Sequence, residues 1–318
     1  MDKLGLSCVI VALASCLSVC PCRAEEALIE PAGTYLYAEK SGENLFMDLY
    51  VPADSLRDES KPVILFMFGG GFIQGERNEG RHVRWFGDLV KAGYPVVSID
   101  YRLGLKNEKK LGISSAGKFE EAINMAVEDL YDATLFIIAN GEELGINPYN
   151  IVLSGSSAGA ITVLQAEYEL CNDTPRSKVL PEGFDYKGIM AFAGCVFSTK
   201  GKPVYARTPC PTMMLHGTKD RLVPYSGVSV FNLMMASSPI LFKVMSKAGC
   251  NCRIYRYKGV GHDVAAAYGW ALNEELDFLK RSVVNGERLV LDQTVSESGM
   301  PKTKYGGMGF KDLKATDD

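Results

Sequence analysis

Continuous apolar runs and helical repeats of apolar residues alternate along most of this chain. The runs at residues 63–68, 94–99 and 151–154 contain no charged residue, and each has the length of a strand buried on both faces. Between the second and third runs, apolar residues recur at helical spacing from residue 119 to about residue 141. This alternation predicts an α/β fold in which a mostly parallel central sheet carries helices on both faces.

The same patterns predict the remaining elements. Strand-like residues on either side of a Ser-Gly-Glu-Asn turn predict a hairpin near the N-terminus. Apolar spacings of three and four predict a last amphipathic helix, and shorter runs predict further strands and helices. The predicted ranges are strands at residues 34–39, 45–51, 189–196, 212–215 and 253–257, and helices at residues 81–92, 226–248 and 265–283.

The third apolar run ends in the motif GSSAG at residues 155–159, which leads straight into a helix of small residues. This strand–turn–helix context is the one in which G-x-S-x-G forms a nucleophile elbow. Ser157 would then stand on a strained turn, and the flanking glycines remove side chains that would collide there. The amide of Ala158 would face the space in which an oxyanion forms. The alternative is an ordinary loop rich in serine and glycine.

A serine hydroxyl needs a base to take its proton, and the chain has three histidines. His262 lies in a glycine-rich loop between the last predicted strand and the last predicted helix, so it can reach the edge of the sheet. We therefore predict His262 as the base. His216, at the end of a strand, is interpreted as a packing residue, and His82 lies near the start of an earlier helix.

The carboxylate that orients the base should come between nucleophile and base in chain order. Asp220 meets this condition, because it lies in the turn after a predicted strand. It would hold His262 in the required tautomer and stabilise the imidazolium. Asp263 would face elsewhere because it adjoins the base in sequence. Asp100 precedes Ser157 and is interpreted as a loop anchor.

Three consecutive glycines follow the first apolar run. Glycines there let the backbone approach a substrate and expose its amides, so this loop is predicted to supply the second half of the oxyanion hole. Phe72, directly after the glycines, is predicted as a substrate contact. A dinucleotide-binding loop is the alternative for this stretch. It fails on spacing, because Gln74 occupies the position of the third glycine in G-x-G-x-x-G.

These motifs together resemble an α/β-hydrolase over residues 34–283. They are most similar to bacterial carboxylesterases related to hormone-sensitive lipase, acetylxylan esterases and feruloyl esterases. The resemblance implies a catalytic triad of Ser157, Asp220 and His262, with oxyanion donors at Gly70, Gly71 and Ala158. The motifs that carry it are GGGF at residues 69–72, DYRL at residues 100–103, Asn147-Pro148, GSSAG at residues 155–159, Asp220 and His262.

The sequence departs from the family pattern at two positions. Phe68 stands where the family usually has a histidine before the glycines, so another group must hold that loop. Ser156 stands where the lipase-like branch often has an aspartate. Neither change removes a reacting group.

The predicted function is a secreted serine carboxylesterase that hydrolyses short-chain or aromatic esters through an acyl-enzyme. The resemblance and the predicted export point to small-molecule or carbohydrate esters, such as those on plant polysaccharides, as substrates. Two alternatives stay open: a serine exopeptidase of related fold, and a non-catalytic, hydrolase-like binding module. The oligomeric state is not predicted.

Composition narrows the possible partners and cofactors. The formal net charge is −4 and no basic face is evident, so no nucleic-acid partner is predicted. With three histidines and no paired metal-ligand spacing, we predict no metal and no cofactor. Residues 112–118 resemble a P-loop, but Phe119 stands where a serine or threonine should bind magnesium.

The chain is predicted to comprise three parts. Residues 1–24 read as a signal peptide, with cleavage before Glu25. A lipobox ending at Cys16 is the alternative, and its lipid would be the only membrane contact. Both alternatives predict a secreted or periplasmic protein, and the lipobox predicts a lipoprotein. Residues 25–284 form the catalytic domain, and residues 285–318 a flexible or surface-wrapped tail.

Five cysteines lie beyond the predicted signal peptide. Cys210 and Cys252 each precede a predicted strand, and these two strands should be parallel neighbours. A disulfide between them is therefore an expectation for an oxidising compartment.

Overall fold

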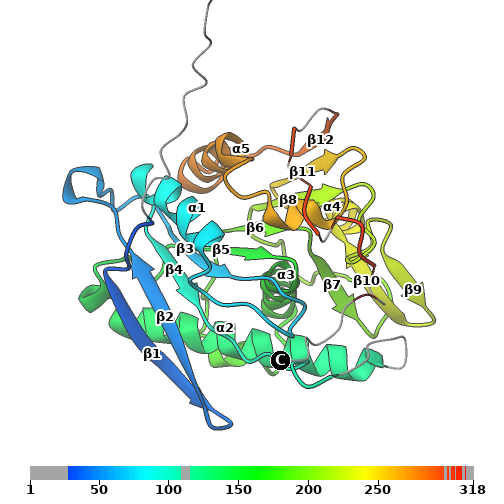
Figure 1. The fold of residues 1–318 in the computed structure, drawn as a ribbon, viewed down its shortest axis with the longest axis horizontal. Coiled ribbons are helices and arrows are strands. Elements are labelled where there is room, and N and C mark those ends of the chain that lie inside the picture. Colours follow the sequence, from blue (N-terminus) through cyan, green and yellow to red (C-terminus); the bar gives the residue numbers. More distant parts are fainter. Residues whose placement is uncertain are drawn as a thin grey trace, which may run out of the picture.

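The computed structural model describes residues 28–108, 115–296, 299–300, 302–304, 306–309 and 312. Its centre is a nine-stranded sheet in the order β1-β2-β4-β3-β5-β6-β8-β11-β12 (Figure 1). The first three strands pair antiparallel, and every later pairing is parallel. The strands of this sheet are β1 (Gly33–Lys40), β2 (Glu43–Tyr50), β3 (Val63–Met67), β4 (Val96–Ile99), β5 (Ile151–Ser156), β6 (Gly188–Phe192), β8 (Thr212–Gly217), β11 (Cys252–Tyr257) and β12 (Leu291–Val295).

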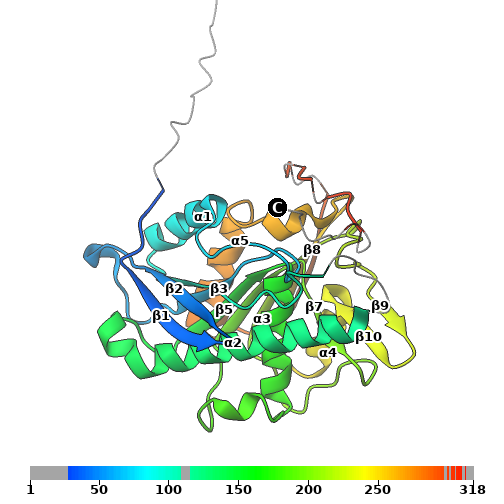
Figure 2. The ribbon, with the colours of Figure 1, turned by 60° about the horizontal axis from the view of Figure 1, so that its bottom comes forward.

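Helices cover both faces of this sheet. Figure 2 shows α1 and α5 on one side and α2 and α4 on the other, and α3 packs against both α2 and β5. The predicted α/β architecture is therefore confirmed. The helices are α1 (Gly80–Lys91), α2 (Ala116–Leu144), α3 (Ala158–Cys171), α4 (Ser238–Lys247) and α5 (Leu272–Asp277), which continues as the π-helical segment η5 (Phe278–Val284). No helix among the described residues has the length and apolar character needed to cross a membrane.

The predicted long helix at residues 226–248 is wrong. This stretch forms β9 (Val228–Val230), β10 (Leu233–Ser237) and only then α4. Gly227 and Phe231 have φ angles of 73° and 53°, which a right-handed helix does not allow. Gly227 directly precedes β9, and Phe231 lies in the turn of the hairpin that β9 and β10 form. The hairpin joins β7 (Cys195–Ser198) in a second sheet of three antiparallel strands.

Two other predicted boundaries also change. The run at residues 189–196 was predicted as one strand, but it divides into β6 and β7 around Ala193, whose φ is 58°. The predicted helix at residues 265–283 begins later, because Gly269 has a φ of 81° and separates α5 from the 3-10 turn η4 (His262–Ala266).

Residues 291–295 form a strand that their sequence pattern does not predict. β12 adds a parallel strand to β11 at the edge of the main sheet. Its central three residues are exposed, so the strand has no apolar face that periodicity could detect. Beyond it, Gly309 makes a parallel bridge with Arg221, which brings this part of the tail back to the catalytic edge of the sheet.

The expected disulfide does not form in the structure. β8 and β11 are parallel neighbours, but their register places Cys252 opposite Thr212 rather than opposite Cys210. Both thiols are free, and Cys252 Sγ lies 3.1 Å from Ser246 Oγ. Extending the register by two residues brings Cys250 to Cys210, and Cys250 Sγ lies 3.2 Å from the Cys210 carbonyl oxygen.

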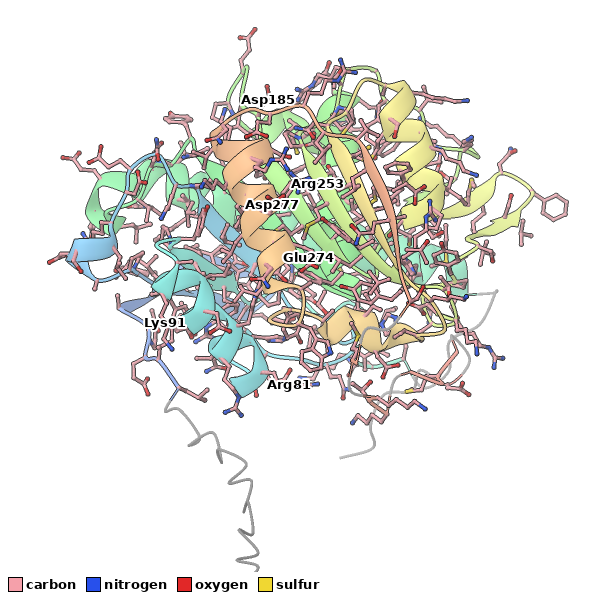
Figure 3. The ribbon with its side chains drawn as sticks, turned by 90° about the horizontal axis from the view of Figure 1, so that it is seen from above. Arg81, Lys91, Asp185, Arg253, Glu274 and Asp277 are labelled. Carbon is pink, nitrogen blue, oxygen red and sulfur yellow. The ribbon has the colours of Figure 1, made fainter. Side chains whose placement is uncertain are left out.

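A buried arginine fixes α5 on the sheet. Arg253 of β11 is fully buried, and its Nη1 lies 2.6 Å from Asp277 Oδ2 at the end of α5 (Figure 3). Its Nη2 donates to Ser282 Oγ at 2.8 Å, and the guanidinium lies 5.5 Å from the centre of the Phe278 ring. The charge is therefore paired and packed rather than buried alone.

A buried acid between α5 and α1 predicts a pH-dependent stability. Trp85 Nε1 donates to Glu275 Oε2 at 2.7 Å. Burial, assisted by the charges of Glu274 and Asp88, raises the pKa of Glu275 from 4.5 to about 8. The folded state thus keeps a proton that the unfolded state releases, so this group lowers stability as pH rises from about 4.5 to 8.

We expect Glu275→Gln to remove this dependence while keeping an oxygen for Trp85. The Tm of the variant relative to the unchanged protein should rise between pH 5 and pH 8, as measured by thermal unfolding. Glu143→Gln, at an exposed position of α2 that does not contribute to the pKa of Glu275, is the control and should show no such trend. A Tm difference that stays constant with pH would contradict the assignment.

Candidate active site

The GSSAG motif forms a sharp turn between β5 and α3. Ser157 has φ and ψ of 50° and −113°, a strained combination for a residue with a side chain. Its amide donates to the Phe192 carbonyl at 2.8 Å, which holds the turn in place. A Cβ on Gly159 would lie 2.1 Å from the Met67 carbonyl oxygen, so only glycine lets α3 start this close to β3. The motif is thus an elbow that presents Ser157 at the carboxyl end of the sheet.

The structure brings the three predicted triad residues together. Ser157 Oγ lies 2.8 Å from His262 Nε2. On the other side of the imidazole, Nδ1 lies 2.7 Å from Asp220 Oδ2. These contacts form one continuous hydrogen-bonded chain, in the geometry that lets an imidazole take the serine proton.

Asp220 is held as a carboxylate. The amides of Leu222 and Val223 donate to its Oδ1 at 2.9 and 3.0 Å, while Oδ2 faces His262. Burial acts to raise the pKa of Asp220, but hydrogen bonds from His216 and His262 outweigh it and hold the pKa well below its usual range. An ionised Asp220 can therefore stabilise an imidazolium at neutral pH.

His216 is a second histidine that lies next to Asp220. Its ring is fully buried, with Nδ1 2.8 Å from Ser238 Oγ and Nε2 2.9 Å from the Val223 carbonyl oxygen. The same Nε2 lies 3.4 Å from Asp220 Oδ2. Both ring nitrogens are engaged away from Ser157, which fits the interpretation of His216 as a packing residue.

The glycine loop after β3 lies beside the elbow. A Cβ on Gly69 would lie 3.2 Å from Ser157 Cβ, and one on Gly70 would lie 1.8 Å from the Gln74 carbonyl oxygen. Gly70 and Gly71 have φ angles of 120° and 69°, so both positions require glycine. They line the same cleft as Ser157 and place backbone amides near it. Opposite them, Ala158 is the first residue of α3, where an amide has no acceptor within the helix.

The glycine loop is held by a tyrosine, in the absence of a histidine at residue 68. Tyr101 donates its hydroxyl hydrogen to the Phe68 carbonyl oxygen at 2.9 Å. The two rings pack with centroids 4.5 Å apart and planes 30° apart. Burial raises the pKa of Tyr101, so the hydroxyl stays protonated and remains a donor.

The prediction that Phe72 contacts substrate is wrong for this structure. Its side chain is fully buried and is not part of the cleft that contains Ser157. Its ring centre lies 5.6 Å from that of Phe119 and 6.3 Å from that of Tyr101. The φ of 62° at Phe72 turns the side chain into this aromatic cluster, away from the cleft, and the cluster supports the glycine loop.

One supporting contact was not predicted from the sequence. Ser156 Oγ donates to the Ala265 carbonyl oxygen at 2.6 Å. This bond joins the elbow to the turn that carries His262, so it fixes the distance between nucleophile and base. The motif showed a small polar residue at this position, but its partner is 109 residues away in sequence.

Asp100 anchors a loop, as predicted. Its Oδ2 accepts from Arg77 Nη1 at 2.7 Å, and Arg77 Nε also pairs with Asp48 at 2.9 Å. These contacts lie away from the Ser157–His262 pair.

Ser157 and His262 line a cleft of about 490 Å³. Leu222, the small residues Ala265 and Ala266, and Tyr268 form its apolar part. Its polar rim consists of Gln74, Glu76, Glu79, Arg81, Thr303 and Lys304. Figure 3 shows Arg81 at the start of α1. Within the described ranges, no group of three or more His, Cys, Asp or Glu side chains is arranged to hold a metal ion.

Comparison with known proteins agrees with this architecture. Residues 47–173 match the family model described as BD-FAE. The apo form of Thermogutta terrifontis esterase 2 superposes with a TM-score of 0.59 at 20% identity, covering 81% of this chain and 97% of that one. The butyrate-bound form of the same esterase gives a TM-score of 0.59 at 21% identity, covering 79% and 94%.

Curated relatives match over shorter stretches. Pyrethroid hydrolase Ces2e of Rattus norvegicus is 31% identical over 121 residues, which is 37% of this chain and 20% of that protein. Neuroligin-2 of Mus musculus is 30% identical over 156 residues, which is 42% of this chain and 17% of that protein. The chain thus spans about a fifth of the length of these relatives. Sheet order, elbow and structural neighbours agree, and the chain has the fold of these esterases.

Proposed function

We propose that this protein is a serine carboxylesterase that works through an acyl-enzyme. The observation that carries the proposal is the chain of hydrogen bonds from Ser157 through His262 to Asp220 on the floor of a cleft. The curated relatives include a pyrethroid hydrolase, and the structural neighbours include an esterase bound to butyrate. Both support an ester as the substrate.

The geometry supports a two-step reaction. Ser157 Oγ attacks the ester carbonyl carbon while His262 Nε2 takes the hydroxyl proton, and the oxyanion forms among the amides of Gly70, Gly71 and Ala158. The imidazolium then gives its proton to the leaving alcohol, which leaves an acyl group on Ser157. Water, deprotonated by His262, attacks that acyl group, and the serine leaves with the proton.

The cleft supports a short acyl group and a soluble alcohol. The apolar part of the cleft is built from Leu222, Tyr268 and two alanines, whereas the rim is charged and polar. None of the residues that line the cleft belongs to the three-stranded sheet of β7, β9 and β10, so this sheet forms no part of the cleft wall. A short-chain or aromatic ester of a carbohydrate, such as an acylated plant polysaccharide, is the substrate class we infer.

A panel of esters and amides tests this proposal. We expect turnover of acetyl and feruloyl esters, a steep fall in kcat/KM with acyl chain length, and no hydrolysis of aminoacyl amides. The rate should not jump when a substrate passes its micellar concentration. Peptide hydrolysis without ester hydrolysis would instead point to an exopeptidase, and a preference for long-chain triglycerides would point to a lipase.

We propose the cellular location of the protein from its N-terminal sequence, which lies outside the described residues. We expect the native host to export the protein and remove residues 1–24, so that Glu25 becomes the N-terminus. A lipidated Cys16 is the other outcome that fits export. Intact-mass measurement on protein from that host distinguishes them, and an exported chain that retains Met1 would contradict both.

A further inference from the structure

The C-terminal tail contacts the loops that carry two triad residues. Asp263, the neighbour of His262, accepts a hydrogen bond from the Thr303 amide through Oδ1. Arg221, the neighbour of Asp220, forms the parallel bridge with Gly309. The tail is therefore fastened beside both the base and the carboxylate.

The contact between tail and loop is too close for larger residues. A Cβ on Gly306 would lie 2.0 Å from Asp263 Oδ2, and a Cβ on Gly261 would lie 1.8 Å from the Gly306 carbonyl oxygen. Gly261 has a φ of −90°, so close approach rather than backbone conformation requires glycine at this position. The neighbouring Gly307 has open space where its Cβ would be. This part of the tail is thus packed against the catalytic loop at one defined point.

Fastened in this way, the tail contributes to the cleft. Thr303 and Lys304 line it together with Ser157 and His262. The hydroxyl of Thr303 and the ammonium of Lys304 are hydrogen-bond donors, and they join the polar part of the rim. Residues from the far end of the sequence therefore form part of the wall around the reacting serine.

The position of the tail identifies the part of the substrate that it meets. His262 must pass its proton to the leaving alcohol, so the alcohol lies on the His262 side of Ser157. Gly261 and Asp263, which flank His262, are the residues that the tail packs against. The alcohol side of the cleft is therefore the side that the tail closes.

We propose that Thr303 and Lys304 form the binding wall for the alcohol part of the ester, and that Asp263 and Gly306 hold this wall in place. Polar donors at this wall favour a hydroxyl-rich alcohol over an alkyl alcohol. The inference rests on the proposed esterase function and adds to it the residues that select the leaving group. Asp263 is a positioning residue in this scheme, since it acts through the tail.

Two acetate esters with different alcohols test the wall in the full-length protein. Ethyl acetate has an alcohol too small to reach the rim, whereas acetylated xylotriose has a large hydroxyl-rich one. We expect Gly306→Ala to lower kcat/KM for acetylated xylotriose about tenfold, mainly through KM, the loss that follows from one missing polar contact. Activity on ethyl acetate should fall less than about threefold. Gly307→Ala is the matched control and should change neither value.

Point variants at the wall itself keep the test independent of folding. Lys304→Ala should reduce the preference for acetylated xylotriose in the same direction, while Lys302→Ala, which does not line the cleft, should leave it unchanged. Asp263→Ala should lower the preference, and Asp263→Asn, which keeps an acceptor for the Thr303 amide, should restore most of it.

The outcomes separate this inference from the proposed function. If the unchanged protein hydrolyses neither acetate, the esterase proposal fails before any variant is compared. If it hydrolyses both, and Gly306→Ala and Lys304→Ala leave the ratio of the two kcat/KM values unchanged, the wall is refuted. Equal losses of kcat/KM on both substrates, together with a lower Tm, would show that the tail has only a structural role. That result would also refute the proposed binding wall.

Discussion

Ser157→Ala should lower kcat for ester hydrolysis by at least about 10³-fold, because removing a nucleophile leaves only oxyanion stabilisation and binding. Ser157 Oγ lies 2.8 Å from His262 Nε2, so it is the hydroxyl placed to lose its proton to the base. The backbone turn is fixed by the bond from the residue 157 amide to Phe192, which alanine keeps. Steady-state kinetics and thermal unfolding together measure the effect, and Tm should change little.

Ser156→Ala is the matched control on the same turn. It removes the bond to Ala265 but no reacting group, so we expect a smaller loss of activity and a lower Tm. Equal activity in Ser157→Ala and the unchanged protein would refute the assignment of the nucleophile.

His262→Ala should also lower kcat by about 10³-fold or more, since the nucleophile and its base act as a unit. His216→Ala is the informative comparison, because both imidazoles lie beside Asp220. It should lower Tm by removing buried hydrogen bonds, yet leave much of the activity, since its ring has no contact with Ser157. Kinetics and thermal unfolding of both variants provide the test. A larger loss from His216→Ala than from His262→Ala would mean that the base is wrongly assigned.

The sheet and the elbow could be predicted from the sequence because their signals are local. A strand buried on both faces is a continuous apolar run, and all five residues of β3 and all six of β5 are buried. The elbow needs glycine on both sides of Ser157, which a short motif shows directly. The order Ser157, Asp220, His262 followed from the chain order of this fold.

The predictions that were wrong concern features that are not local. These features depend on contacts between residues that are distant in sequence. The apolar residues of 226–248 suit a helix or a hairpin, and pairing with β7 decides for the hairpin. Phe72 follows a motif that faces substrate, but a positive φ and the rings of Tyr101 and Phe119 turn it inward.

The C-terminal tail is the clearest example of structure that depends on contacts distant in sequence. Its residues are polar and aperiodic, so no pattern predicts that they form an edge strand and then reach the cleft. The sequence contains the two glycines that permit the contact, Gly261 and Gly306. Their pairing depends on the path of the chain between them, which no local rule gives.

Labelling with a fluorophosphonate, followed by peptide mapping, tests the central claim most directly. A fluorophosphonate forms a stable bond only with an activated serine, so it reports the nucleophile without any assumption about the natural substrate. We predict one adduct per chain, located on Ser157, with loss of esterase activity in proportion to labelling and no adduct in His262→Ala. An unlabelled protein, or an adduct on a different residue, would contradict the account.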